Sequence, residues 1–302
     1  MTLRQLEAFF WAAQFGSFSA AAVKLHMTQS ALSKRIAELE TALGNKLFDR
    51  DLYRPKLTAN GRLLLDKARE MLTLQGEIHD SMRNAEALEG ECRFGVTELV
   101  AMTWLPDLVT RIRKAHPHVV LEPYVDLSHC LRDKLLEGTI DFAVMPMNQL
   151  QPGLTNELLA PVEFSLMASP RLVEPGTMLT SALLAELPVV TQITGSSVTP
   201  IFDAWAHANG LRLHRILGSN SLTAIAHMVI AQLGIGFLPT AYFSPLVQSG
   251  HLCCLHTPTA LPQLDYFLTY RTDETNALAR AMRDAVITAC DFSRPQPTLV
   301  LS

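Results

Sequence analysis

Two groups of polar residues in this chain have types and spacings suited to chemistry. The first begins at Thr28, which can cap a helix whose first turns carry Gln29, Ser30, Ser33 and Lys34 on the face away from its apolar positions. Short hydrogen-bonding groups with a cation, at the N-terminal end of a helix, suit insertion into the major groove of DNA. An ordinary helical hairpin with a solvated polar face would show the same pattern, so both interpretations stay open for this stretch alone.

The second group lies at later junctions where a predicted strand gives way to a helix. Helix N-termini with hydroxyl caps favour anions, so these junctions predict a site for a small metabolite that carries a carboxylate. Each hydroxyl could equally be a plain N-cap, and we see no Arg in these loops to clamp a carboxylate, which leaves a neutral or aromatic ligand open. Met145, Met147 and Phe267 could supply apolar walls. The predicted ligand-binding residues are Thr97, Glu98, Leu99, Ser128, Met145, Met147, Gly195, Ser196, Ser197 and Phe267.

Three helices must position the first group. Apolar residues at helical spacing predict a first helix that starts near Leu3 and has a capping box formed by Thr2 and Gln5. A short helix of small residues follows over 20–25, and His26 and Met27 form the turn. The third helix runs from Thr28 to Leu43, and Gly44 ends it as a left-handed C-terminal cap.

A basic hairpin follows the third helix. Apolar residues at 47–48 and 57 predict two short extended segments. The stretch that joins these segments contains Pro55 and the cations Arg50, Arg54 and Lys56. Cations there would lie beside the phosphate backbone, which positions a protein on DNA without reading sequence. The complete set of predicted DNA-contacting residues is Lys24, Thr28, Gln29, Ser30, Ser33, Lys34, Arg35, Arg50, Arg54 and Lys56.

A long helix is predicted from the cap at Thr58 to about Leu88. Its seam positions alternate spacings of four and three, as in a heptad repeat, and are apolar except for Gln75: Leu64, Ala68, Met71, Gln75, Ile78, Met82 and Ala85. The residues before it offer too little apolar surface to cover such a helix, so we expect it to pair with a second copy of the chain.

From residue 91 onward, short apolar strands alternate with helices, which predicts parallel sheets. The pattern strand, helix, strand, helix, strand occurs over 94–146 and again over 189–239, so we expect two similar lobes facing a cleft. The stretches 161–169 and 263–271 are predicted strands that cross between the lobes, and a final helix covers 276–290.

The first ~65 residues resemble the winged helix-turn-helix of LysR-type transcriptional regulators. The resemblance is carried by a long ordered pattern that includes Phe18, Ala21, Ala22, the run Thr28-Gln29-Ser30-Ala31-Leu32-Ser33, Gly44 and Phe48. Ala20 departs from the pattern, because the family often has a basic residue there. Residues 91–293 resemble the effector-binding domain of the same family, which is itself similar to periplasmic solute-binding proteins.

The resemblance implies an α/β protein with an all-α-rich N-terminal winged helix-turn-helix, a long linker helix and a two-lobed effector domain. The expected domains are 1–58 for DNA binding, 59–89 for the dimerisation helix and 91–302 for the effector. Within the last, lobe I comprises 91–161 plus 268–293, and lobe II comprises 162–267. Expected partners are double-stranded DNA with an inverted-repeat operator, a small-molecule effector, further copies in a homodimer or a homotetramer, and RNA polymerase as an additional candidate. The alternative is a small-molecule-binding module or enzyme that carries a helical dimerisation head.

Composition agrees with this assignment. Residues 1–62 hold nine Lys and Arg against five Asp and Glu, whereas the rest of the chain holds sixteen against twenty-four, so nucleic-acid contact should be local to the basic head. Five scattered cysteines predict free thiols, inert when buried. The chain has no long apolar run and no secretory pattern at its start, which predicts a cytoplasmic protein.

No enzyme motif stands out. Gly234-Ile-Gly236 follows a predicted helix and precedes a strand, which is the reverse of the order in a dinucleotide-binding fingerprint. Pro117 between His116 and His118 breaks helical spacing for a metal pair. We therefore expect no catalytic activity, no cofactor and no metal.

Overall fold

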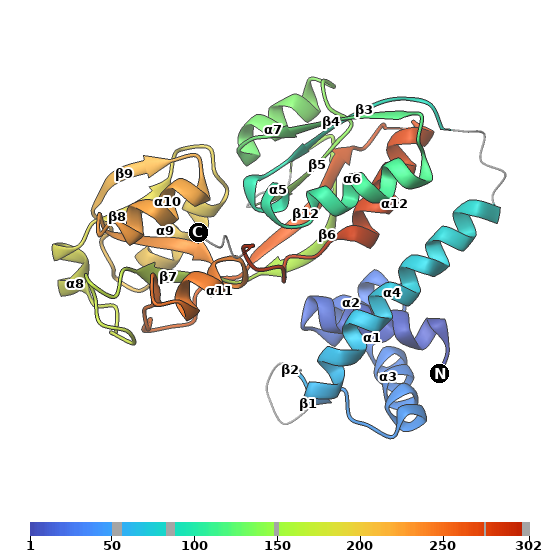
Figure 1. Ribbon diagram of the computed structural model, residues 1–302, viewed down its shortest axis with the longest axis horizontal. Coiled ribbons are helices and arrows are strands. Elements are labelled where there is room, and N and C mark those ends of the chain that lie inside the picture. The colour runs from blue at the N-terminus through green and yellow to red at the C-terminus, as the bar shows by residue number, and fades with distance from the viewer. Residues whose placement is uncertain (50–55, 83–87, 148–150, 275, 298–302) are drawn as a thin grey trace. The chain divides into compact units, whose positions relative to one another are not determined.

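A computed structural model describes residues 1–49, 56–82, 88–147, 151–274 and 276–297 (Figure 1). The chain folds into two compact units, residues 1–88 and residues 89–302.

The first unit is a small helical domain with a two-stranded hairpin. Its capping signals act as the sequence predicts: Thr2 and Gln5 form a capping box, the Thr28 hydroxyl accepts from the Ala31 N–H at 3.2 Å, and Gly44 takes φ +65° at the end of the third helix. The predicted turn at His26 has φ +50°, a left-handed conformation uncommon outside glycine. The elements are α1 (Leu3–Phe15), α2 (Phe18–Lys24), α3 (Gln29–Leu43), β1 (Phe48–Asp49), β2 (Lys56–Leu57) and α4 (Ala59–Met82).

A buried carboxylate ties the hairpin to α3. The Glu40 side chain is almost fully buried, and its Oε1 accepts hydrogen bonds from the N–H groups of Leu47 at 2.9 Å and Phe48 at 3.3 Å. Lys46 Nζ lies 3.2 Å from Oε2. Burial by itself raises the pKa of Glu40, but these hydrogen bonds outweigh it, so the pKa lies below its ordinary value. The ionised form of Glu40 therefore fixes where the hairpin begins.

The fourth helix starts as predicted but presents a different apolar face. The Thr58 hydroxyl accepts from the Gly61 N–H at 3.0 Å, and a Cβ on Gly61 would meet the Leu47 carbonyl oxygen at 2.2 Å, so only glycine allows this approach. Ala68 of the predicted seam is wholly buried within the unit, where α4 packs on α1. Met71 of the predicted seam is exposed, together with Leu63 and Leu74 outside the seam, and at 100° per residue these three fall on one face. The predicted seam is therefore wrong at Ala68, whereas Ala85 and the side chains of Ile78 and Met82 lie outside the described part of the chain.

The second unit contains two five-stranded sheets, one in each lobe. Lobe I has the strand order β4-β3-β5-β12-β6, and lobe II has the order β11-β7-β10-β8-β9. Lobe I is built from β3 (Gly90–Val96), α5 (Glu98–Thr103), α6 (Leu105–Ala115), β4 (Val119–Val125), α7 (Ser128–Leu136), β5 (Phe142–Pro146), β6 (Leu154–Val162), β12 (Leu264–Arg271) and α12 (Ala277–Ala289). Lobe II is built from β7 (Phe164–Ala168), α8 (Ser181–Glu186), β8 (Val189–Gln192), α9 (Val198–Ala208), β9 (Arg215–Ser219), α10 (Leu222–Ile230), β10 (Ile235–Pro239), α11 (Thr240–Gln248) and β11 (Cys253–Cys254).

The topology confirms the internal repeat. In lobe I, β3 lies between β4 and β5 and is parallel to both, and in lobe II, β8 lies between β9 and β10 in the same way. The chain moves across each sheet in one direction and then back, so right-handed connections put successive helices on opposite faces. The helices α7 and α10 are therefore equivalent, and their N-termini lie at the carboxyl ends of strands, where open α/β sheets bind ligands.

Two expectations about the crossings are wrong in detail. The stretch 161–169 is not one strand, because β6 ends in lobe I at Val162 and β7 begins in lobe II at Phe164. Lobe I was expected to resume at residue 268, yet β12 pairs with β6 from Leu264 onward. The Gln263 amide donates to Glu163 Oε1 at 3.3 Å, which joins the two crossings. The strand β6 and the short helix α5 were not predicted.

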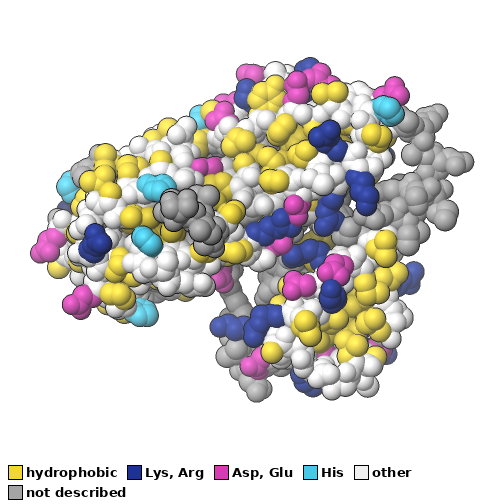
Figure 2. Space-filling model, in the orientation of Figure 1, with side chains coloured by type: hydrophobic (Ala, Val, Ile, Leu, Met, Phe, Trp, Pro, Cys, Tyr) yellow, Lys and Arg dark blue, Asp and Glu magenta, His cyan; other side chains and the backbone are white. Residues whose placement is uncertain are grey.

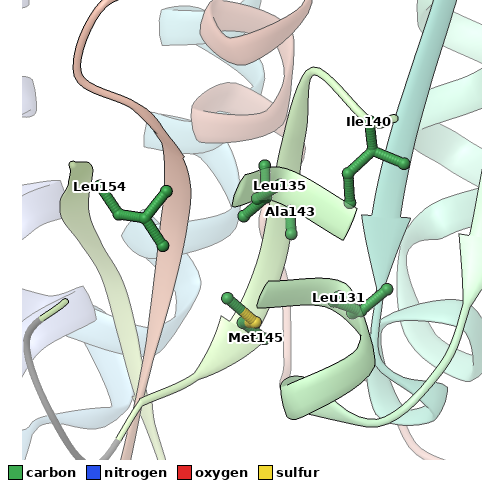
Figure 3. Close-up of a cluster of buried hydrophobic side chains, with 6 residues drawn as sticks. All are labelled: Leu131, Leu135, Ile140, Ala143, Met145 and Leu154. Carbon is green, nitrogen blue, oxygen red and sulfur yellow. The ribbon is translucent and has the colours of Figure 1, made fainter. Parts of the chain in front are cut away.

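A compact apolar cluster lies under α7 (Figure 3). Leu131 and Leu135 of α7 pack against Ala143 and Met145 of β5, and all four are fully or almost fully buried. Met147 packs against this cluster from the end of the strand. The cluster fixes the start of α7 relative to β5, and thereby positions the side chains at its N-terminus.

Replacing Glu40 with Gln should destabilise the head by about 2 kcal/mol, because hydrogen bonds to a charged group are lost from a buried site. The contribution of the lowered pKa is present above the ordinary value of 4.5 and disappears as pH falls through the lower folded value. The gap between wild type and variant should therefore shrink in acid. Calorimetry of the full chain across pH measures this.

Glu38→Gln is the matched control, because Glu38 lies on the same helix and is exposed. Its effect should stay within about 0.5 kcal/mol. Equal stability of the Glu40→Gln variant and the control at neutral pH would contradict the role given to Glu40.

Candidate functional site

The start of α3 is an exposed polar surface. Thr28, Gln29, Ser30 and Lys34 are exposed, whereas Ser33 is half-buried. The Thr28 and Ser30 hydroxyls lie 3.0 Å apart. The apolar side chains of α3, among them Leu32 and Ile36, are buried in the core, so this polar turn faces solvent. Its side chains can therefore hydrogen-bond to another molecule.

A residue of α2 that the sequence did not single out for this role helps to orient the surface. Ser17 caps α2, and the neighbouring Ser19 hydroxyl donates to Gln29 Oε1 at 2.9 Å. This bond holds the Gln29 amide across the turn between the two helices. The contact of Ser19 with Gln29 depends on how α2 packs against α3, which spacing along the sequence does not give.

The predicted cations differ in position. Lys24 is half-buried, with its ammonium 5.0 Å from the centre of the Trp11 ring, and Arg35 is also half-buried. Lys56 is exposed on β2, which pairs antiparallel with β1 as the base of the predicted hairpin. Arg50 and Arg54 lie outside the described residues. On the face drawn in Figure 2, basic side chains are interspersed with acidic ones over the molecule.

Nine of the ten predicted ligand-binding residues of the second unit divide between two cavities. Cavity 1, of about 190 Å³, is lined by both lobes: Thr97, Glu98, Leu99, Val125, Asp126, Leu127, Gln192, Val198, Asn220, Ser221, Leu222 and Tyr266. Cavity 2, of about 170 Å³, is also lined by both lobes: Ser128, His129, Arg132, Met145, Pro146, Met147, Gln151, Gly195, Ser196, Ser197 and Pro200. Neighbours in sequence, Leu127 and Ser128 on one lobe and Ser197 and Val198 on the other, line different cavities, so the cavities adjoin.

Cavity 2 collects two helix N-termini. Ser128 is the first residue of α7 and Ser197 is the N-cap of α9, and both residues are at least nine-tenths buried. Neither hydroxyl makes a hydrogen bond with any other described residue, unlike Ser196, whose Oγ accepts from the Val198 N–H at 3.1 Å. The Ser128 and Ser197 hydroxyls at cavity 2 therefore have unused hydrogen-bonding capacity, whereas the first-turn N–H groups of His129 and Val198 already donate to Gly195 and Ser196.

Arg132 supplies the cation that sequence reasoning missed. It lies four residues after Ser128, so helical spacing places both side chains on the same face of α7. Its guanidinium also meets Asp133 Oδ1 at 2.9 Å, in a partly exposed ion pair that contributes little to stability. Arg132 lies within the helix that follows the loop and not in the loop itself.

One backbone contact joins the lobes at cavity 2. The His129 N–H donates to the Gly195 carbonyl at 3.2 Å, and the His129 ring Nδ1 lies 3.1 Å from the same oxygen. Gly195 has φ +107°, and a Cβ there would lie 2.1 Å from Nδ1. Only glycine lets the ring approach this closely.

Phe267 lines neither described cavity. Successive residues of β12 point to opposite faces, and Tyr266 faces cavity 1 in its place. Burial raises the pKa of the Tyr266 phenol far above its ordinary value. Tyr266 is therefore a neutral hydrogen-bonding group at neutral pH.

The cysteines are free, and burial raises the pKa of the Cys92 thiol to about 12. Within the described ranges no group of three or more His, Cys, Asp or Glu is arranged to hold a metal ion. No helix among those residues is long and apolar enough to cross a membrane.

Both units match known protein families. Residues 3–62 match the family described as "Bacterial regulatory helix-turn-helix protein, lysR family", and residues 85–291 match the "LysR substrate binding domain". The chain is 30% identical over 272 residues to the uncharacterized HTH-type transcriptional regulator YeiE of Escherichia coli, covering 87% of this chain and 88% of the relative. It is 27% identical over 297 residues to the SDS degradation transcriptional activation protein of a Pseudomonas strain, covering 94% and 95%.

Solved structures share the fold. CrgA, a LysR-type transcriptional regulator from Neisseria meningitidis, aligns with a TM-score of 0.60 at 21% identity, covering 95% of this chain and 98% of that one. HinK, a LysR family regulator from Pseudomonas aeruginosa, aligns with a TM-score of 0.56 at 22% identity, covering 95% and 97%. The relatives are transcriptional regulators, so the alternative of an enzyme with a helical head finds no support among them. This chain belongs to the LysR family: it is a DNA-binding transcriptional regulator controlled by a small-molecule effector in its two-lobed domain.

Proposed function

We propose that the start of α3 reads the operator, with Gln29, Ser30, Ser33 and Lys34 at base edges or nearby phosphates. The exposed polar first turn of this helix, held by the cap at Thr28, is the observation that supports the proposal. The Gln29 amide, oriented by Ser19, can donate to base acceptors in the major groove. Lys24, Arg35 and Lys56 contribute phosphate contacts, and the sequence adds Arg50 and Arg54 to them.

We propose that two copies pair through α4. Leu63, Met71 and Leu74 give this helix an exposed apolar face that a second copy can cover. A twofold dimer places two α3 helices on successive turns of the major groove, so the operator is an inverted repeat. A tetramer, as a dimer of dimers, and contact with RNA polymerase extend the same proposal, and the protein acts in the cytoplasm, where its DNA lies.

We propose that the effector binds across cavities 1 and 2, with an anionic group such as a carboxylate in cavity 2. The first turns of α7 and α9 line cavity 2 together with Arg132, and this supports the placement, because helix N-termini, serine hydroxyls and a guanidinium all favour an anion. Met145 and Met147 give the same cavity an apolar wall, which suits an aromatic acid.

Replacing Gln29 with Ala should weaken binding to the operator by about five- to 150-fold, the range for one good base contact. Fluorescence anisotropy on an inverted-repeat duplex that the wild type selects from random DNA measures this loss. Nonspecific binding at low salt should persist, because phosphate contacts carry it.

Thr41→Ala serves as the control, since Thr41 is exposed at the opposite end of α3. Unchanged operator affinity in the Gln29→Ala variant would show that α3 does not read bases through this residue.

Monocarboxylates such as acetate, pyruvate and benzoate should raise the melting temperature of the full chain above that in chloride at equal ionic strength. At tenfold excess over the dissociation constant, a ligand stabilises by about 1.4 kcal/mol, a shift of about 3–6 °C for a domain of this size. Arg132→Gln should abolish the shift.

The exposed Arg113 on α6 provides a charge-matched control, and Arg113→Gln should respond like the wild type. If the Arg132→Gln variant still showed the rise in melting temperature, the proposal that the anion binds in cavity 2 would be contradicted.

A further inference from the structure

The two lobes are joined at cavity 1 by a carboxylate. Glu98, the first residue of α5 in lobe I, reaches the first turn of α10 in lobe II. Its Oε1 accepts from the Ser221 hydroxyl at 2.7 Å and from the Thr223 N–H at 3.4 Å, and its Oε2 accepts from the Leu222 N–H. Lobe I thereby supplies the anion at a helix N-terminus of lobe II.

This carboxylate uses up the hydrogen-bond donors of that helix end. The first N–H groups of a helix have no partner inside it, and here Leu222 and Thr223 donate to Glu98. The next, Ala224, donates to the Ser221 hydroxyl at 3.1 Å. The start of α10 therefore differs from the start of α7, where the Ser128 hydroxyl and N–H have no partner among the described residues, and from the start of α9, where the Ser197 hydroxyl has none.

The lining of cavity 1 is also acidic. It contains the carboxylates of Glu98 and Asp126 and, among the described residues, no Lys, Arg or His. An incoming carboxylate would find no free N–H at the start of α10 and no cation, and two like charges would repel it. An ammonium would be attracted by these two carboxylates, and a neutral hydrogen-bond donor would find acceptors in them.

We propose that Glu98 is a specificity-determining residue that fills the anion position of cavity 1 from within the chain, so that an effector places its anionic group in cavity 2 and a cationic or hydrogen-bond-donating group in cavity 1. The inference rests on the proposed function, in which the cleft holds the effector. It narrows the effector class to molecules with both kinds of group, such as an amino acid.

The test uses acetate as a stand-in for the Glu98 carboxylate, in the full chain with the Arg132→Gln change to silence cavity 2. With Glu98 intact, acetate should shift the melting temperature by less than about 1 °C relative to chloride at equal ionic strength. Adding Glu98→Ala should lower the melting temperature by about 5 °C, and acetate should then restore about 3 °C, since it can occupy the vacated helix end.

Glu174→Ala in the same background is the control, because it removes an exposed carboxylate of lobe II. It should create no acetate response. An acetate response equal with and without Glu98, or none in the folded Glu98→Ala protein, would overturn the proposal. Because Glu98 and its replacement are compared within one Arg132→Gln background, the difference between them reports on Glu98 whether or not the proposed anion site at Arg132 is correct.

Hydrogen exchange on the wild type tests the same contact without a variant. The amides of Leu222 and Thr223 should exchange at least about tenfold more slowly than the Ser128 amide at the start of α7, which has no acceptor among the described residues. Equal exchange at the two helix ends would overturn the assignment of Glu98 to α10. A Glu98→Gln variant should speed exchange at Leu222 and Thr223, and leave Ser128 unchanged.

Discussion

The first turn of an α-helix carries N–H groups that the helix itself cannot satisfy, and the functional surfaces of this chain are built where that constraint applies. At α3 the Thr28 hydroxyl satisfies one such group and leaves an exposed polar turn, which is the proposed DNA contact. At α7 and α9 the first turns line a cavity between lobes, where the Ser128 and Ser197 hydroxyls have no partner among the described residues. At α10 the chain fills the position with its own Glu98. The role of each helix N-terminus depends on which residues of other elements lie beside it.

The parallel strands explain why these helix ends meet. Each lobe repeats the same strand order, so α7 in lobe I and α10 in lobe II begin at the same edge of their respective sheets. The contact of His129 with Gly195 and the reach of Glu98 to Ser221 join the lobes at two points along this edge. A ligand that binds better when these contacts are formed shifts the lobes toward that arrangement, and only such differential affinity can transmit a signal to the DNA-binding head.

Local features were predictable from sequence because they depend on near neighbours. The caps at Thr28 and Thr58, the end of α3 at Gly44 and the repeated strand pattern all follow from spacings within a few residues. Features that depend on which face of a strand or helix lines the site were harder to predict from sequence. Phe267 was chosen where Tyr266 faces the cavity, since neighbours on a strand point to opposite faces. Glu98 was assigned to the site, but its partner lies more than a hundred residues away and could not be read from spacing. Arg132 could have been found, because it lies one helical turn from Ser128.

The proposed function depends on whether this chain reads an inverted repeat through the first turn of α3. Selection of bound duplexes from a random DNA library by the full-length protein, followed by sequencing, measures this. Two inverted half-sites should be enriched, with centres about one helical turn, or a whole number of turns, apart. Enrichment of no sequence, or of a single half-site without its inverted partner, would contradict it.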